Sequence, residues 1–169
     1  MPLDRLFAPW RGEYVSANTP TGNEGRACIF CTAPDRFAET GSLVVFVAPR
    51  NVVMMNRFPY SSGHVMVAPR RHIARLGDAS PEELHEMLSL AQRVEGIFGQ
   101  AYKPDGMNMG MNLGRAAGAG FADHIHLHLV PRWMGDANFM TTTAETRVIP
   151  EDPAEACRRL RPFFEGGPA

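Results

Sequence analysis

The chain has 169 residues, 44% of them hydrophobic and 21% charged, which is the composition of a globular domain that can bury a core. Its net charge of −1 provides no overall field for nucleic acid or an anionic membrane, so an anionic ligand must be bound by local donors. No stretch approaches the roughly 20 apolar residues of a membrane-spanning helix, and the mixed charges at the N-terminus exclude an ordinary signal peptide, so we expect one cytoplasmic domain over residues 1–169.

The first part of the chain is predicted to form an irregular arm followed by three strands. Residues 1–27 are rich in Gly, Pro, Asn and Thr, which predicts the arm. Short apolar and β-branched runs predict strands at 42–47, 52–56 and 64–68. Pro49-Arg50-Asn51 separates the first two runs, so these two strands are expected to form a hairpin.

A long helix is predicted to begin at Ser80-Pro81-Glu82-Glu83. This segment offers an N-cap serine, a proline at the first helical position and a glutamate that closes a capping box. Apolar residues then recur at helical spacing and predict a face that packs on a sheet: Leu84, Leu88, Ala91, Val94, Ile97 and Phe98. His85 is expected to face solvent, and Pro104-Asp105-Gly106 ends the helix.

The last part of the chain is predicted to contain three strands and a closing helix. The strands are expected at 107–112, 124–130 and about 139–149. Asp152-Pro153 starts the helix, whose Leu160, Phe163 and Phe164 can pack on the core. Several strands, one long helix, more strands and a C-terminal helix together predict an α+β fold with a mainly antiparallel sheet.

Three of the six histidines lie within five residues, in the run His124-Ile125-His126-Leu127-His128. On a strand, alternate side chains share a face, so the three imidazoles are expected on one surface, successive ones ~6.8 Å apart. Ile125, Leu127 and Leu129 would then face the core.

Three interpretations of this run are open: surface histidines, a metal-hydrolase site and nucleophilic catalysis. Charge repulsion below neutral pH disfavours the first. A hydrolase metal needs a third ligand and a carboxylate base, but Asp123 points away from the face of His124. A neutral imidazole can instead attack phosphorus and form a phosphoramidate, which a second nucleophile opens. Flanking imidazoles can bind the phosphate by hydrogen bonds.

The histidine run is followed by Pro131-Arg132-Trp133, and in this form it resembles the histidine-triad (HIT) superfamily. Residues 56–69, with Asn56, Gly63-His64 and Pro69, are similar to the upstream nucleotide-binding hairpin of that family. The segments LFAPWR at 6–11 and WMGDANF at 133–139 are similar to its bacterial branch, which is related to diadenosine tetraphosphate phosphorylases and is Fhit-like.

The resemblance implies a homodimeric α+β domain that transfers a nucleoside monophosphate through the middle histidine, His126, without a catalytic metal. It implies that His128 contacts the phosphate or the leaving group and that His124 braces the site. The expected substrate is a dinucleoside polyphosphate, with adenine as base. A hydrolase of nucleoside phosphoramidates and a nucleotide-sensing binding module are the alternatives.

Further nucleotide contacts are carried over from the family to single positions. Asn56 matches a residue that contacts the ribose hydroxyls, His64 lies at the edge of the site, and Asn112 sits at a phosphate-contacting position. Met54, Met66 and Met109 are candidates for the floor of a base pocket.

The loop 112–120 before the histidine run is predicted to bind phosphate. Gly114, Gly118 and Gly120 allow the backbone to approach an anion, and Arg115 can add a charge-assisted hydrogen bond. Many family members carry Gln followed by Ser or Thr where this chain has Gly120-Phe121, so one side-chain donor is missing. Whether water or phosphate opens the intermediate is therefore left open, and Arg132 is a further candidate donor for phosphate.

Two cysteines form a C-x-x-C pair, Cys28 and Cys31, in a chain with an odd number of cysteines. Thr32-Ala33-Pro34 argues against the helix that a redox pair would open. Two thiolates can bind one zinc ion if two more ligands are present, and His72 is one candidate. Bacterial relatives and galactose-phosphate uridylyltransferases resemble this pattern, which implies a structural zinc held by Cys28, Cys31, His72 and His124. Cys157 is expected in the core or partly exposed.

Overall fold

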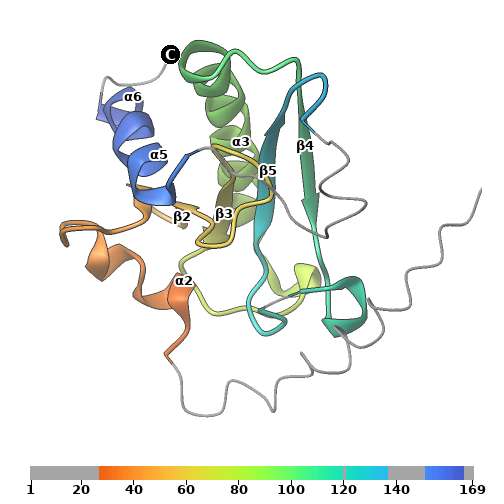
Figure 1. Cartoon of the computed structure of the whole chain (residues 1–169). Coiled ribbons are helices and arrows are strands. Elements are labelled where there is room, and N and C mark those ends of the chain that lie inside the picture. Colours follow the sequence, from red (N-terminus) through yellow and green to blue (C-terminus); the bar gives the residue numbers. More distant parts are fainter. Residues whose placement is uncertain (1–26, 120, 137–150, 166–169) are drawn as a thin grey trace, which may run out of the picture.

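The computed structural model describes residues 27–119, 121–136 and 151–165 (Figure 1). The arm expected at 1–27, apart from residue 27, and the strand expected near 139–149 lie outside these residues, and so does Gly120. In the described part of the chain no helix is both long and apolar enough to cross a membrane.

Five strands form one antiparallel sheet in the order β1-β2-β3-β5-β4. Their bounds are β1 Val44–Val47, β2 Asn51–Met55, β3 Val65–Pro69, β4 Gly106–Met111 and β5 Leu127–Arg132. The expected hairpin is formed by β1 and β2. The antiparallel sheet and the helices that accompany it confirm the predicted α+β class.

The long helix α3 (Pro81–Ala101) begins at the expected capping box. The Ser80 hydroxyl accepts a hydrogen bond from the Glu83 amide at 3.2 Å, and the Glu83 carboxylate accepts one from the Ser80 amide at 2.7 Å. Asp152 caps the closing helix by accepting a hydrogen bond from the Ala154 amide at 2.8 Å. The other helices are α2 (Ile29–Thr32), α5 (Pro153–Leu160) and α6 (Pro162–Glu165), and short 3-10 turns lie at Pro34–Arg36, Leu76–Asp78 and Arg115–Ala117.

The two faces of the sheet have different coverings, because side chains alternate along each strand. Helices α3, α5 and α6 pack on one face in a single core, to which β5 contributes Leu127 and Leu129 (Figure 1). A smaller cluster on the other face joins β2 and β3 to Phe30 of α2. His126 and His128 lie at this second face, beside α2.

Three sequence predictions about elements were wrong in detail. Leu88 is 54% exposed, because the buried stripe of α3 runs through Met87 and Leu90 instead. The closing helix is split, since Pro162 lacks the amide that would continue α5 beyond Leu160. The cysteine pair does open a helix, but α2 is a single turn with Cys28 at its N-cap.

Candidate active site

The predicted strand at 124–130 is wrong at its N-terminal end, because β5 begins only at Leu127. The Ile125 amide donates to the Ile73 carbonyl at 2.8 Å, outside the sheet ladder. His124, His126 and His128 are all buried. On a strand with one solvated face, side chains on that face would be exposed, so these histidines are covered by other parts of the chain. The rings of His126 and His128 lie 4.7 Å apart between centroids, whereas His124 turns toward the cysteines of α2.

The hydrogen bonds of His126 define which ring nitrogen is free. Its Nδ1 lies 2.9 Å from the carbonyl oxygen of His124. A carbonyl oxygen only accepts, so Nδ1 carries the proton in the neutral ring. Nε2 therefore keeps its lone pair, which is the form of imidazole that can attack an electrophile.

A second chain of hydrogen bonds places a proton on the opposite edge of His128. The Tyr60 amide donates to Nδ1 of His64 at 3.0 Å, so the proton of neutral His64 lies on Nε2. That Nε2 lies 2.9 Å from Nδ1 of His128, which must accept. His128 then carries its own proton on Nε2 and can donate it in a hydrogen bond to a ligand.

Burial keeps these rings neutral at pH 7. Desolvation lowers the pKa of His64 to about 3, aided by the charges that His128 and His126 would carry. Burial and the neighbouring His126 lower the pKa of His128 to about 4. The pKa of His126 is also lowered by burial, against the opposing effect of its bond to the His124 carbonyl. A lone-pair nitrogen and an N–H donor therefore exist side by side at neutral pH.

The ring of Phe30 packs against the face of the His126 ring, while His128 contacts His126 edge-on. The two rings are stacked, with centroids 4.8 Å apart and an interplanar angle of 26°. Phe121 meets Phe30 edge-on at 6.0 Å. Phe30 is 1% exposed and lies between the two cysteines of α2, so the packing of α2 orients the imidazole. This role of Phe30 was not predictable from the sequence, since a single apolar residue carries no signal for it.

The four residues expected to bind zinc lie together. Nδ1 of His124 is 3.3 Å from the sulfur of Cys28 and 3.6 Å from that of Cys31, and Nδ1 of His72 is 3.3 Å from the sulfur of Cys31. All four donor atoms lie within 4.8 Å of one another. Ligands of a tetrahedral zinc ion, at roughly 2.3 Å for sulfur and 2.0 Å for nitrogen, are spaced about 3.5 Å apart. The donor set fits such an ion.

The surroundings of the cluster also suit a metal. Nε2 of His124 lies 2.8 Å from the Pro69 carbonyl oxygen, so it carries the proton and leaves Nδ1 as the ligand atom. Burial and the adjacent Cys28 raise the pKa of the Cys31 thiol to about 11. A bound cation reverses this effect because it stabilises both thiolates.

The expected nucleotide contacts occupy different environments. His64 is 0% exposed and bonds to His128, so it lies behind the site rather than at its edge. Asn56 is half-buried, and its side-chain Oδ1 accepts a hydrogen bond from the Phe58 amide at 2.9 Å. Asn112 is half-buried at the end of β4, and Arg115 is exposed. Gly114 and Gly118 have φ of +80° and +84°, which side chains rarely adopt, so the loop requires glycine at both positions.

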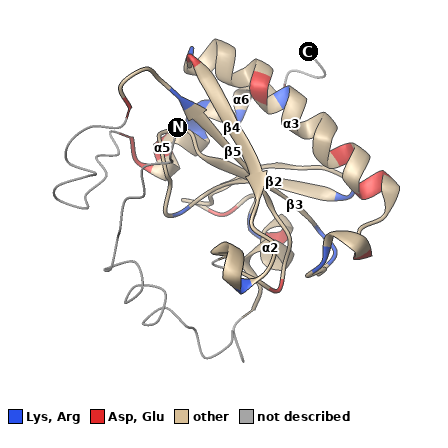
Figure 2. Cartoon of the chain, turned by 90° about the vertical axis from the view of Figure 1, so that its right-hand side faces the viewer, with Lys and Arg blue, Asp and Glu red and all other residues tan. Residues whose placement is uncertain are grey.

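Other candidates are placed less favourably for ligand binding. Arg132 is paired in a bidentate manner with Asp136, at 2.5 and 2.7 Å, and also donates to Asn108. Met54 and Met66 are buried with Phe30 in the smaller cluster, whereas Met109 is 54% exposed. Lys and Arg are spread over several elements and interspersed with Asp and Glu (Figure 2), in keeping with the small net charge.

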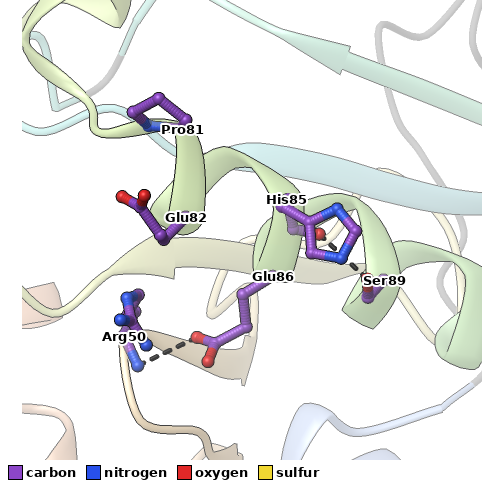
Figure 3. Close-up of a pocket in the computed structure, with 6 residues that line it drawn as sticks. All are labelled: Arg50, Pro81, Glu82, His85, Glu86 and Ser89. Atoms are coloured by element: carbon purple, nitrogen blue, oxygen red, sulfur yellow. Dashed lines mark hydrogen bonds between the residues drawn. The ribbon is translucent and has the colours of Figure 1, made fainter.

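A surface pocket of about 560 Å³ lies at the start of α3 and is lined by none of the buried histidines (Figure 3). It is lined by Arg50, Pro81, Glu82, His85, Glu86 and Ser89. The Arg50 amide donates to the Glu86 carboxylate at 2.9 Å, and the Ser89 hydroxyl donates to the His85 carbonyl at 2.9 Å. The first bond attaches the β1–β2 turn to α3, and the second lies within α3. His85 is exposed, as predicted.

Comparisons with known proteins agree with this geometry. The HIT domain family matches residues 38–134. AP-4-A phosphorylase of Mycobacterium tuberculosis is 36% identical over 153 residues, which cover 88% of this chain and 78% of the relative. Bis(5'-adenosyl)-triphosphatase of Dictyostelium discoideum is 29% identical over 131 residues, which cover 73% and 87% of the two chains.

A solved structure shares the fold and part of the sequence. It is a zinc-bound histidine triad family protein from Mycobacterium smegmatis, 28% identical, with a TM-score of 0.65. The match covers 82% of this chain and 94% of that one.

Proposed function

The chain belongs to the HIT domain family, and we propose that it is an enzyme that cleaves dinucleoside polyphosphates through a nucleotidyl-histidine intermediate on His126. The observation that carries this proposal is the pair of ring nitrogens at the centre of the site. Nε2 of His126 holds a lone pair, and Nε2 of its neighbour His128 holds a proton. The names of the relatives, a phosphorylase of AP-4-A and a triphosphatase, support the substrate class.

The reaction proceeds in two displacements. Nε2 of His126 attacks the phosphorus bonded to one nucleoside, a P–N bond forms, and the anhydride P–O bond breaks. The remaining nucleoside polyphosphate leaves as an anion, and Nε2–H of His128 donates a hydrogen bond to the departing oxygen. The His124 carbonyl, bonded to Nδ1–H of His126, stabilises the positive charge that the ring acquires. A second nucleophile then attacks phosphorus, and the P–N bond breaks to restore neutral His126.

Phosphate is the proposed second nucleophile, with water as the alternative. A phosphate acceptor needs a second anion site beside the first. The loop over residues 112–118 offers backbone N–H groups where Gly114 and Gly118 adopt positive φ, and Arg115 is exposed in the same loop. Gly120, proposed as the position that leaves room for this anion, lies outside the described residues. Arg132 is a weaker candidate because Asp136 already pairs with it.

Incubation with diadenosine tetraphosphate, with and without millimolar phosphate, tests the reaction and its acceptor. We expect phosphate to speed cleavage and to yield adenosine diphosphate in place of the monophosphate. Arg115→Ala should raise the phosphate concentration needed for half-maximal rate several-fold, with a smaller effect on substrate binding, because it removes one charge-assisted hydrogen bond that solvent partly screens. Arg75→Ala, another exposed arginine, is the matched control.

The products decide between the alternatives. Adenosine monophosphate alone at saturating phosphate identifies a hydrolase and contradicts the phosphorylase proposal. Nucleotide binding without any turnover identifies a sensing module instead. If a nucleoside phosphoramidate is turned over much faster than diadenosine tetraphosphate, the protein is a hydrolase of nucleoside phosphoramidates.

A structural zinc ion bound by Cys28, Cys31, His72 and His124 is part of the proposal. The spacing of the donor atoms supports it, and the zinc-bound relative adds to that support. Four protein ligands leave no open position, so the ion would stabilise the fold and take no part in the displacement. We also propose that the protein is a homodimer, as the family resemblance implies, and that it is cytoplasmic, as expected from its composition.

A further inference from the structure

The turn that carries His64 packs against the ring of Tyr102, at the end of α3. Gly63 has φ of +73° and is buried, and a Cβ atom added there would lie 2.9 Å from Cε2 of Tyr102 and 3.2 Å from Cγ of Pro131. The phenol ring therefore lies directly on the backbone of Gly63. Because the two groups are in close contact, the position of this ring limits the positions open to the peptide that precedes His64.

Tyr102 is in turn attached to the C-terminal part of the chain. Its hydroxyl donates a hydrogen bond of 2.8 Å to Oε2 of Glu151, a carboxylate that is 11% exposed. Arg159 of α5 lies 3.0 Å from the other oxygen of Glu151, and its guanidinium lies 5.2 Å from the centroid of the Tyr102 ring. Three side chains thus form one partly buried charged and aromatic cluster, which fixes the rotation of the ring.

His64 transmits its position to the site through one short contact. It is completely buried, and its Nε2–H is the donor that reaches Nδ1 of His128 at 2.9 Å. The same loop closes through the His64 carbonyl, which accepts the Asn56 amide at 3.0 Å. A shift of the Gly63 peptide therefore lengthens or bends the bond that fixes the orientation of His128.

We propose that Tyr102, held by Glu151 and Arg159, is a positioning residue that fixes His64 and thereby the donor nitrogen of His128. Glu151 and Arg159 lie beyond residues 38–134, which the HIT domain family matches, so the chain adds this support from outside the matched region. The proposal rests on the proposed function for its kinetic effect, but its structural effect is measurable without substrate.

Substitutions that break the cluster at different points test the proposal. Tyr102→Phe keeps the ring against Gly63 and removes the hydroxyl, whereas Glu151→Ala removes the acceptor. Both should lower kcat about tenfold with KM changed less than twofold, because a slightly misplaced donor weakens the transition state more than binding. Glu151→Gln retains an acceptor oxygen and should recover most of the rate.

Two neighbouring arginines provide a matched control. Arg159→Gln breaks the contact with Glu151 but leaves the acceptor of the Tyr102 hydroxyl, so it should lower kcat by a smaller factor than Glu151→Ala. Arg158→Gln breaks only an exposed pair with Glu155 on the same helix and should leave kcat unchanged. The proposal would be overturned if kcat, measured well below the melting temperatures, equalled the wild-type value in Tyr102→Phe, Glu151→Ala and Arg159→Gln.

The ¹⁵N chemical shifts of the imidazoles show whether Tyr102 positions His64 and His128 or only stabilises the fold. They do so without substrate, so the result does not depend on the proposed function. Tyr102→Phe and Glu151→Ala should move the ring signals of His64 and His128, but not those of exposed His85. A lower melting temperature with unmoved His64 and His128 signals would contradict positioning. If the signals move but the wild-type protein turns over no dinucleoside polyphosphate, the positioning stands and the proposed function fails.

Discussion

Two separate hydrogen-bonded chains determine the tautomers of the buried histidines. One ends at the His124 carbonyl and leaves a lone pair on His126, and the other runs from the Tyr60 amide through His64 to His128. Each chain is anchored at a backbone group, the His124 carbonyl in one and the Tyr60 amide in the other, and neither group changes its protonation. The site is therefore asymmetric although its residues are chemically identical.

The lowered pKa values predict a loss of stability in mild acid. A histidine with a folded pKa of about 3 or 4 and an unfolded pKa near 6.5 binds its proton in the unfolded state first. Its contribution is complete above pH 6.5 and is lost as the pH falls toward 4. Each such group gives a slope of up to about 1.4 kcal/mol per pH unit in the free energy of unfolding.

Urea unfolding between pH 7.5 and pH 5 measures this slope. His128→Asn removes one titrating ring and keeps an oxygen that can accept a hydrogen bond from His64. The free energy of unfolding of this variant should therefore change less steeply with pH, by up to about 1.4 kcal/mol per pH unit. The proposed zinc ligands are the same in both proteins, so their acid sensitivity cancels in the comparison. Identical slopes would show that His128 titrates normally in the folded protein.

At the scale of elements, the single turn α2 joins the proposed zinc ligands to His126, the proposed nucleophile. Cys28 and Cys31 flank Phe30, whose ring stacks on His126. A turn of four residues has little stability of its own, so tertiary contacts and the proposed ion must hold it. The cysteines were predictable from their spacing, but the role of Phe30 was not, because a ring stack between distant residues leaves no pattern along the chain.

Metal removal tests the role proposed for this element. Purified protein should contain about one zinc per chain, and a chelator should lower the melting temperature. Cys31→Ser should lower the zinc content, whereas Cys157→Ser, at a buried thiol outside the cluster, should not. Protein without any bound metal, or with the melting temperature unchanged by chelation, would refute a structural ion.

The limits of sequence interpretation appear where backbone geometry departs from a regular element. Period-two spacing placed all three histidines on one strand face, but β5 starts at Leu127 and His124 turns to the cysteines. The capping box at Ser80 and Glu83 was predictable because it depends on local spacing alone. The bond between His64 and His128 was not, since it depends on the pairing of β3 with β5.

At the scale of the whole molecule, the sheet lies between the main hydrophobic core and the candidate active site. One face carries α3, α5 and α6 over a continuous apolar core, and the other carries α2 with the histidines. The alternation of apolar residues along the strands predicted the core side of Leu127 and Leu129. The position of the C-terminal helix beside α3 was less predictable, because it depends on contacts such as Arg161 with the Val44 carbonyl.

The most direct test of the account is detection of a nucleotidyl group on His126. Protein mixed with diadenosine tetraphosphate is quenched in alkali, where a phosphoramidate survives, and its peptides are analysed by mass spectrometry. We predict an adenylate on His126 in the wild type, none in His126→Ala, and turnover abolished in that variant while nucleotide binding persists. An adenylate on another residue, or turnover by His126→Ala within a few-fold of the wild type, would contradict the account.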